Sequence, residues 1–456
     1  MKVNPYVFRQ YDIRGVVEED FCPEFVLGLG KAFGTLVKRE GLKKIALSGD
    51  IRLSTPKLKK HFQEGTLSVG IDVIDLGILP TPVNYYSMWK LNVDAAVQIT
   101  GSHNPANMNG FKMTVNKQAL YGDQIQELRT LMEQDDFENG EGAVNQYNIM
   151  DDYIEMIQSK IVLDKEMKVA MDCGNASACL VAPTIFQRLG VELTELFCDV
   201  DGTFPNHHPD PNVPQNLAHL IDTIQNGTFD AGLAYDGDAD RIGLIDEIGN
   251  IIFPDQIMSL MLPEIVNRDD QIIFDVKCSQ SLEDEIIRLG GQPVIWKTGH
   301  SLIKQKMRRI GSPFGGEMSG HICLADDYFG YDDAIYVSAR VVQMLSRQDK
   351  KLSELVAALP QYHSTPEIRL NCVSDEEKFR IDKEATAYFK NNYDCLDIDG
   401  VRIRFSDGWG LVRASNTQPA LVCRFEAKTK ERMQEIESLV LNKLSELGEF
   451  ELSSHP

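Results

Sequence analysis

The sequence predicts an α/β protein of several domains, and two observations carry that prediction. At 456 residues the chain is long for one domain, and the usual size range favours three or four. Along most of its length, short apolar strand-like runs alternate with longer helix-like stretches, a pattern typical of mixed sheets with crossover helices. Hydrophobic residues make up 43% and charged residues 25%, as in ordinary globular proteins with an ample core.

The first domain is predicted to span residues 1–147. Its strand-like runs are Lys44–Asp50, Val73–Gly77 and Asp94–Ile99, and its helix-like stretches are Pro23–Glu40 and Phe62–Ser68. A polar, acidic run from Glu133 to Asn148 marks the boundary, because such runs are poor core formers.

Residues 148–249 form the second predicted domain. Lys168–Asp172 is strand-like, Cys173–Ser177 turns into a helix, and strand-like runs at 230–235 and 242–246 flank an acidic loop. A Pro-rich loop carries His207 and His208. Adjacent histidines rarely bind one ion together, so we expect a structural role for this pair.

Two further domains are predicted at 250–363 and 364–456. The third has a helix at Gln256–Ile265 and a buried strand at Ile272–Lys277. The last begins beyond Leu359-Pro360. It has strand-like runs at 367–370, 401–405 and 420–426 and an amphipathic helix at 430–447.

Charge and cysteine content exclude several kinds of partner and compartment. The formal net charge is −22, which argues against nucleic acid or an anionic membrane as a partner. No apolar run approaches membrane-spanning length. Nine scattered cysteines without a Cys-x-x-Cys pair favour reduced thiols and a cytoplasmic protein.

The richest motif is Thr100-Gly101-Ser102-His103-Asn104-Pro105, directly after the strand-like run 94–99. Turn-forming residues end the strand there, so Ser102 lies on a loop at the carboxyl end of a strand, where open α/β sheets bind ligands. His103 could orient the hydroxyl, and Lys112 could return in the next strand as a fixed positive charge. A Ser-His pair alone would favour an ordinary surface loop, but the whole string is much rarer.

This string resembles the active-site loop of the α-D-phosphohexomutase family, most closely the phosphomannomutase/phosphoglucomutase branch, in which the serine carries a phosphoryl group. The resemblance implies four domains around a central active-site cleft: three similar mixed α/β domains and a smaller C-terminal α+β domain. Tyr11-Asp12-Ile13-Arg14-Gly15 also matches the family. In the family this segment places its arginine near the phosphoserine, which implies a catalytic role for Arg14 and a substrate contact for Tyr11.

A second motif, Asp236-Gly237-Asp238-Ala239-Asp240-Arg241, places three carboxylates at alternate positions. An EF-hand is excluded because Arg241 stands where that loop requires glycine. Three converging aspartates repel one another without a cation, and a few carboxylates suit Mg²⁺. The motif also matches the family's metal loop. The resemblance implies Mg²⁺ bound by Ser102 and the three aspartates, with Arg241 assisting catalysis.

Two loops of the third domain resemble the family's sugar-recognition segments. They are Lys297–Ser301 and Gly315–His321, and the second contains Gly-Glu-Met-Ser-Gly, the form found in this branch. Glucosamine-phosphate mutases typically have Gln in place of Met318. Glu317 and Ser319 suit sugar hydroxyls. A general base is also required; His300 and His321 are the first candidates and Lys277 the third. Lys277 is also a candidate substrate contact.

The last domain contributes Arg413-Ala414-Ser415-Asn416-Thr417, which closely matches the family's phosphate-binding loop. Arginine can bind two phosphate oxygens, while Ser415, Asn416 and Thr417 supply neutral donors. A polar hairpin turn with an incidental arginine is the alternative.

The resemblance covers residues 11 to about 426, with the motifs in family order. It implies reversible phosphoryl transfer between the 1- and 6-positions of mannose or glucose phosphates, through phosphoserine and a hexose 1,6-bisphosphate that also acts as activator. The alternatives are a phosphoglucosamine mutase, a phosphoserine hydrolase and a non-catalytic phosphosugar-binding protein. We expect a phosphosugar as the partner, and a monomer or weak homodimer.

Overall fold

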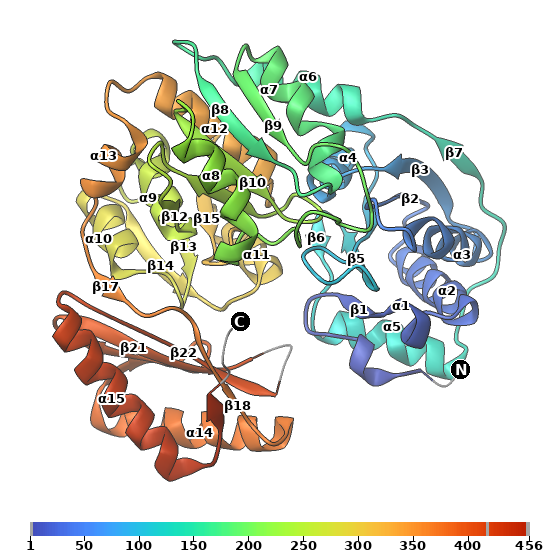
Figure 1. The fold of residues 1–456 in the computed structure, drawn as a ribbon. Helices are drawn as coiled ribbons and strands as arrows, with labels where there is room; N and C mark the ends of the chain where they lie inside the picture. The colour runs from blue at the N-terminus through green and yellow to red at the C-terminus, as the bar shows by residue number, and fades with distance from the viewer. Residues whose placement is uncertain (1–2, 416–418, 453–456) are drawn as a thin grey trace. The chain divides into compact units, whose positions relative to one another are not determined.

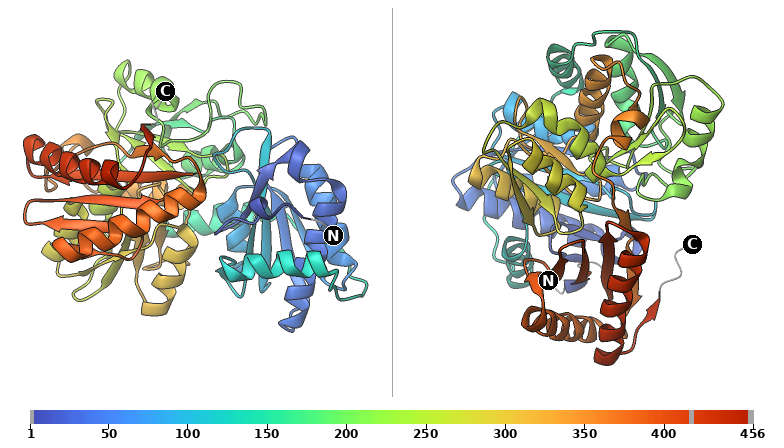
Figure 2. Two further views of the ribbon diagram at one scale, coloured as in Figure 1. Left: turned by 90° about the horizontal axis from the view of Figure 1, so that it is seen from below. Right: turned by 90° about the vertical axis from the view of Figure 1, so that its left-hand side faces the viewer.

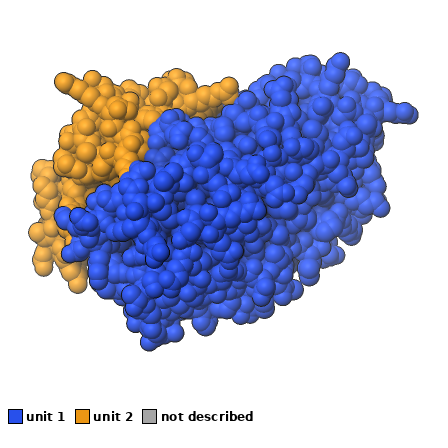
Figure 3. Space-filling model, turned by 90° about the horizontal axis from the view of Figure 1, so that it is seen from above, with its two compact units in different colours: residues 1–257, 319–355 blue, residues 258–318, 356–456 orange. Residues whose placement is uncertain are grey.

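Strands and helices alternate along most of the chain, as the sequence predicts, in a computed structural model that describes residues 3–415 and 419–452 (Figure 1). The chain divides into two compact units (Figure 3). Unit 1 comprises residues 1–257 and 319–355, and unit 2 comprises residues 258–318 and 356–456. Both units contain sheets covered by helices, so the predicted α/β class is confirmed.

A seven-stranded mixed sheet organises the first part of unit 1. Its order is β1-β5-β4-β2-β3-β7, with β6 beside β5. Strands β4, β2, β3 and β7 are parallel, whereas β5 is antiparallel to both β4 and β1. Because β2 and β4 are parallel, the residues that follow them lie at the same edge of the sheet. The strands are β1 (Ile13–Val16), β2 (Lys44–Gly49), β3 (Asp72–Ile78), β4 (Ala95–Ile99), β5 (Met108–Val115), β6 (Gln118–Ala119) and β7 (Val144–Gln146).

Helices α2, α3 and α5 pack with this sheet in the first hydrophobic core, and α4 packs against β2 and β4. The helices of this part are η1 (Pro5–Val7), α1 (Val17–Asp20), α2 (Pro23–Arg39), α3 (Thr55–Leu67), α4 (Thr81–Lys90) and α5 (Asp123–Gln134). Helix α2 crosses α3 closely: a Cβ on Gly30 would lie 2.2 Å from the Phe62 carbonyl oxygen, so only glycine fits. Helix α3 begins seven residues before the predicted Phe62, because Pro56 is compatible with the first turn of a helix.

The acidic run from Glu133 to Asn148, predicted as a domain boundary, contains a strand of the first sheet. Strand β7 lies near its end and pairs in parallel with β3, with Val144 opposite Val73. The first sheet therefore extends as far as residue 146, although the sequence of this stretch is too polar to predict a strand.

A second sheet follows in unit 1, in the order β12-β11-β10-β8-β9. Strands β8, β9 and β10 are parallel, and β10 and β11 form an antiparallel hairpin. Helix α12 packs against β10 and β11. The elements are α6 (Met150–Lys160), β8 (Lys168–Asp172), η2 (Ser177–Leu180), α7 (Ala182–Arg188), β9 (Glu192–Leu196), η3 (Pro214–Leu217), α8 (Ala218–Gln225), β10 (Ala231–Tyr235), β11 (Ile242–Ile245), β12 (Ile251–Ile252) and α12 (Ala334–Ser346). Unit 1 also contains the short strand β16 (Ile322–Leu324), which is not part of this sheet.

In unit 2, β13 lies between β14 and β15 and is parallel to both. The strands are β13 (Gln271–Asp275), β14 (Gln292–Trp296) and β15 (Phe314–Gly316), and the helices between them are α10 (Gln280–Arg288) and α11 (His300–Ile310). Helices α9 (Pro254–Ile265) and α13 (Leu352–Ala357) each begin in unit 1 and end in unit 2.

An antiparallel sheet forms the C-terminal part of unit 2, in the order β19-β20-β21-β22-β18-β23, with β17 beside β22. Helices α14 and α15 run along it and share its core (Figure 2). The elements are β17 (His363–Ser364), β18 (Ile368–Asn371), α14 (Asp375–Asn392), β19 (Asp394–Leu396), β20 (Val401–Phe405), β21 (Gly408–Ala414), β22 (Ala420–Ala427), α15 (Lys430–Leu447) and β23 (Glu451–Leu452). This is the predicted smaller α+β domain.

The sequence predicts reduced cysteines and no membrane-spanning segment. All nine cysteines lie within them, and none forms a disulfide. Over the same ranges, no helix combines the length and the apolar character that crossing a membrane requires.

Candidate functional site

Ser102 lies on the loop between β4 and β5, as the sequence predicts, and is almost fully buried. Its φ is +48°, a left-handed conformation that non-glycine residues adopt only when their surroundings support it. Its hydroxyl donates to Asp236 Oδ2 at 2.8 Å and lies 3.2 Å from His103 Nδ1. The structure therefore brings the first two sequence motifs together at one hydroxyl group.

The acidic loop joins β10 to β11, so strands flank it as predicted. Asp236 Oδ1 accepts the backbone N–H groups of Asp240 and Arg241, which folds the loop around this carboxylate. A Cβ on Gly237 would lie 2.1 Å from the Ser102 carbonyl oxygen. Glycine is thus required at this position because the acidic loop and the serine loop pack backbone to backbone.

Lys112 lies on β5 opposite Gln98, the placement that the sequence predicts. Its ammonium group contacts Asp238 Oδ2 at 2.6 Å and Asp240 Oδ2 at 2.5 Å. Burial would lower the pKa of Lys112, but the charges of Asp238, Asp240 and Asp236 outweigh burial and raise it. Lys112 is therefore a permanent positive charge inside the site.

The three aspartates fit a hard divalent cation. All three are buried, and their carboxylate oxygens lie within 4.8 Å of one another. Burial, and then the charges of Asp240 and Asp238, raise the pKa of Asp236 well above its ordinary value. Asp238 Oδ1 is buried and has no hydrogen-bond partner among the residues that the structure describes. A cation bound to these oxygens would relieve both the repulsion and this missing contact.

Further positive charge lies near the serine. Arg14 is on β1, opposite Gly110 of β5, and pairs with Asp12 at 2.5 Å. Burial, and then the charges of Arg241 and Arg14, lower the pKa of His103 well below its ordinary value, so its imidazole is neutral near neutral pH. Tyr11 lies half-buried in the turn before β1.

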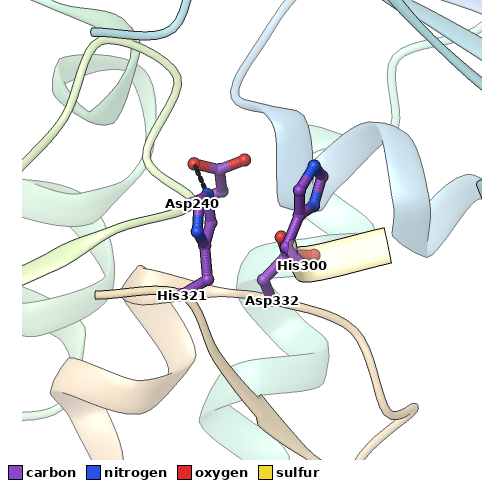
Figure 4. A group of neighbouring side chains, drawn as sticks. All are labelled: Asp240, His300, His321 and Asp332. Atoms are coloured by element: carbon purple, nitrogen blue, oxygen red, sulfur yellow. Dashed lines mark ion pairs between the residues drawn. The ribbon is translucent and has the colours of Figure 1, made fainter. Parts of the chain in front are cut away.

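Ser319 and His321 belong to unit 1, where the segment after residue 318 packs on the start of β11. The Ser319 hydroxyl lies 2.9 Å from His321 Nδ1. His321 Nε2 lies 3.2 Å from Asp240 Oδ1, the ion pair drawn dashed in Figure 4, and 3.3 Å from Arg241 Nε. The structure thus places one candidate general base beside the acidic loop.

The remaining predicted sugar contacts lie in unit 2. Glu317 is buried and accepts the Gly299 N–H at 2.5 Å, just before His300 begins α11. Lys277 Nζ lies 3.3 Å from Glu367 and 4.0 Å from Asp275. Burial would lower the pKa of Lys277, but the charges of Glu367 and Asp275 outweigh burial and raise it, which favours the charged form of Lys277.

Arg413 is buried at the end of β21 and pairs with Asp399 through Nε at 3.0 Å. The same Asp399 oxygen accepts the Thr298 N–H at 3.0 Å. One carboxylate therefore joins the phosphate-loop arginine to a sugar-recognition segment. Ser415 is buried beyond Arg413, whereas Asn416 and Thr417 lie outside the described residues.

The two adjacent histidines hydrogen-bond to protein groups. His207 Nε2 lies 3.0 Å from both carboxylate oxygens of Asp172. His208 hydrogen-bonds through Nε2 to the His103 carbonyl oxygen. The structural role expected for this pair agrees with these contacts, and His208 links its loop to the serine loop.

Sequence reasoning missed several residues that support the site. Asp50 and Arg52 follow β2 and hold the serine loop. Thr81, at the start of α4, donates to Asp238 Oδ2 at 2.5 Å. In unit 2 the missed residues are Asp399, Glu367 and Asp275. Of these residues, only Asp50 could have been found from the sequence, because it ends a predicted strand and such positions often bind ligands. The other residues lie far from the motifs that they contact.

Comparisons with known proteins agree along the whole chain. Four family models match: phosphoglucomutase/phosphomannomutase alpha/beta/alpha domain I at residues 5–139, domain II at 151–249, domain III at 253–362 and the C-terminal domain at 367–443. A phosphomannomutase/phosphoglucomutase of Pseudomonas aeruginosa is 43% identical, over 96% of this chain and 95% of its own length. A phosphoglucomutase of Neisseria meningitidis is 42% identical, over 95% of each chain.

Among solved structures, a phosphoglucomutase/phosphomannomutase family protein of Burkholderia thailandensis superposes with a TM-score of 0.92 at 38% identity. The match covers 98% of this chain and 100% of that one. Four domain models in order, full-length relatives above 40% identity and this fold lead to one conclusion. The chain belongs to the α-D-phosphohexomutase family.

Proposed function

We propose that the chain interconverts the 1- and 6-phosphates of mannose and glucose, with Ser102 as the group that carries the phosphoryl between two sugar positions. The supporting observation is the buried Ser102 hydroxyl, hydrogen-bonded to Asp236 within a loop of three aspartates that also binds Lys112. A phosphohexomutase activity follows from the family and the full-length relatives.

The proposed reaction has two phosphoryl transfers, and each transfer forms one P–O bond and breaks another. The resting enzyme carries phosphoserine; the sugar O6 attacks this phosphorus, the Ser102 Oγ–P bond breaks, and a hexose 1,6-bisphosphate results. The bisphosphate then turns end for end, and Ser102 Oγ attacks the other phosphate to release the product. A base must take the O6 proton in the first step, and His300 and His321 are the candidates.

Charge neutralisation is the main task of the surrounding side chains in phosphoryl transfer. We assign it to Arg14, Lys112 and Arg241. Mg²⁺ held by Ser102, Asp236, Asp238 and Asp240 would polarise the phosphoryl oxygens and offset their charge. Lys112 already neutralises part of the carboxylate charge of this loop.

Substrate recognition is assigned to the remaining predicted residues. Arg413, Ser415, Asn416 and Thr417 would bind the phosphate that does not react. Glu317 and Ser319 would bind ring hydroxyls, and Lys277 and Tyr11 would make further contacts. Arginine and hydroxyl groups suit this task because they donate to phosphate oxygens in a fixed geometry.

We further propose that the four domains extend over residues 1–147, 148–249, 250–363 and 364–456 and that each contributes one loop. We place the enzyme in the cytoplasm, because none of the nine cysteines, all of them within the described residues, forms a disulfide. Its charge of −22 favours small phosphosugars, not nucleic acid, as partners.

The test is a direct assay. Purified protein is incubated with mannose 1-phosphate or glucose 1-phosphate, Mg²⁺ and a trace of hexose 1,6-bisphosphate, and the 6-phosphates are measured. Glucosamine 1-phosphate is the matched comparison substrate. Preferred turnover of glucosamine phosphate would support the phosphoglucosamine alternative, and release of inorganic phosphate without isomerisation would support a hydrolase.

A further inference from the structure

We propose that Arg52 and Asp50 are positioning residues that fix the conformation of the serine loop for phosphoryl transfer. The proposal rests on the proposed role of Ser102 as phosphoryl carrier. Neither residue belongs to the motifs that identify the family in this sequence. Both follow β2, which is parallel to β4 in the mixed sheet, so the carboxyl ends of the two strands lie side by side. Arg52 and Asp50 therefore contact the loop that begins at Thr100.

Arg52 uses all five of its N–H donors on this loop and on Asp50. Its side chain is 1% exposed. Nε donates to Asp50 Oδ2 at 3.1 Å. The other four donors reach backbone carbonyl oxygens of the loop: Ser102 at 2.7 Å, Asn104 at 2.6 Å, Pro105 at 2.6 Å and Met108 at 3.2 Å. One planar guanidinium therefore acts as a template for the backbone from Ser102 to Met108.

Asp50 completes the template from the other side. Its Oδ2 accepts the Thr100 hydroxyl at 2.8 Å and the Gly101 N–H at 3.0 Å. The Thr100 hydroxyl oxygen in turn accepts the Ser102 N–H at 2.9 Å. The two backbone polar groups of Ser102 are thus both held, its carbonyl by Arg52 and its N–H through Thr100 by Asp50.

Close packing shows why this support is specific. A Cβ on Gly101 would lie 2.5 Å from Arg52 Cζ, so the loop can approach the guanidinium only because residue 101 is glycine. Ser102 keeps φ at +48°, a left-handed conformation that is energetically unfavourable for a non-glycine residue. The hydrogen bonds to its carbonyl and N–H offset that cost and direct Oγ toward Asp236.

Arg52 has no donor left for a phosphate, which distinguishes it from Arg14, whose buried Nε has no hydrogen-bond partner among the described residues. Lysine cannot replace it, because an ammonium has three donors and no planar fork. Loss of the template should therefore misplace Oγ and slow chemistry, while phosphosugar binding by unit 2 residues such as Arg413 persists. Small displacements of a reacting atom can cost about 100-fold in rate.

The main test is Arg52→Lys, compared with Arg39→Lys as a matched control. Arg39 is on the surface and pairs with Asp136 and Glu138. We expect Arg52→Lys to lower kcat by about 100-fold and to change KM for the phosphosugar by less than about threefold. Single-turnover phosphorylation of Ser102 by glucose 1,6-bisphosphate should slow to the same degree. Arg39→Lys should leave kcat, KM and the rate of Ser102 phosphorylation unchanged.

Two further variants keep the test decisive if Arg52→Lys does not fold. In Arg52→Ala, added guanidinium ion should restore part of the lost kcat, whereas ammonium should not. Thr100→Val removes only the relay to the Ser102 N–H and should lower kcat by about tenfold at unchanged KM. The proposal would be overturned if folded Arg52→Lys or Thr100→Val kept the wild-type kcat. It would also be overturned if these variants changed KM alone. An inactive wild-type enzyme would instead contradict the proposed function.

Discussion

The serine loop of unit 1 and the recognition loops of unit 2 hold their charged groups in different ways. In unit 1, Arg52 is 1% exposed with every donor used, and Lys112 is buried between two aspartates. In unit 2, Arg413 pairs with Asp399 and Lys277 with Glu367, and those two carboxylates are 18% and 28% exposed. The proposed reacting group is thus fixed by buried partners, whereas each proposed recognition cation has at least one partner that solvent reaches.

This difference matches the two tasks. Phosphoryl transfer needs reacting atoms that are already in place, since reorganisation at the moment of reaction adds to the barrier. Recognition must be reversible, because the bisphosphate has to be released, turned and bound again. A carboxylate at the solvent side can hold an arginine in position and still share it with a phosphate. Variants that affect transfer should change kcat, and variants that affect recognition should change KM.

The largest effect is expected for Ser102→Ala. Because the variant has no group to carry the phosphoryl, kcat should fall by about 10⁴-fold or more. Phosphosugar affinity, measured by calorimetry, should stay within a few fold, since Arg413 and Glu317 are unchanged. Full turnover by this variant would contradict the phosphoserine mechanism.

Metal removal should have the next largest effect. The proposed ligands are the three carboxylates of the acidic loop and the Ser102 hydroxyl, with no cysteine or histidine among them, so hard Mg²⁺ should activate and softer ions should replace it poorly. After exhaustive chelation, kcat should fall by about 10³-fold and return when Mg²⁺ is added back. Undiminished turnover in the chelated enzyme would rule the metal out.

Asp399→Asn should act on recognition with a smaller effect. Asparagine can still accept from the Thr298 N–H but no longer holds Arg413 by charge. We expect KM to rise about tenfold with kcat within about threefold of the wild type. Asp397→Asn is the matched control, because Asp397 is on the same segment and pairs with Lys390. A fall in KM would instead show that Asp399 competes with the substrate for Arg413.

The smallest effect is expected for the choice between mannose and glucose, which differ at C2. A site that binds the intermediate in both orientations cannot assign a contact to C2, because C2 moves to the former place of C5. The ratio of kcat/KM for the two 1-phosphates should therefore lie within about 100-fold. A ratio beyond about 1,000 would show that a dedicated polar contact recognises C2.

Much of this account could be predicted from the sequence, because local signals carried it. The strand before Ser102, the hairpin around Asp236–Asp240 and the helix at 430–447 depend on periodicity and turn residues, and the structure confirms them. The contacts that could not be predicted join residues that are far apart in the sequence. Arg52 looks like an ordinary polar residue after a strand, and only the folded sheet shows which carbonyl groups it meets.

The supporting carboxylates of unit 2 escaped prediction for the same reason. Asp399 contacts Thr298, a hundred residues earlier in the chain, and Glu367 contacts Lys277 across a similar separation. Neither carboxylate lies in a motif or shows a periodic pattern. The start of α3 was missed through a local ambiguity, because Thr55-Pro56 is equally typical of a turn and of the first turn of a helix.

The most direct test of the central claim is to follow a phosphoryl group through Ser102. The enzyme is loaded with radiolabelled glucose 1,6-bisphosphate, digested, and the labelled peptide is identified by mass spectrometry. A second loaded sample is mixed with unlabelled mannose 1-phosphate in a rapid-quench experiment. We predict about one label per chain, confined to the peptide that contains Ser102, and transfer of that label to sugar at least as fast as kcat. Label on another residue, or transfer slower than turnover, would contradict the account.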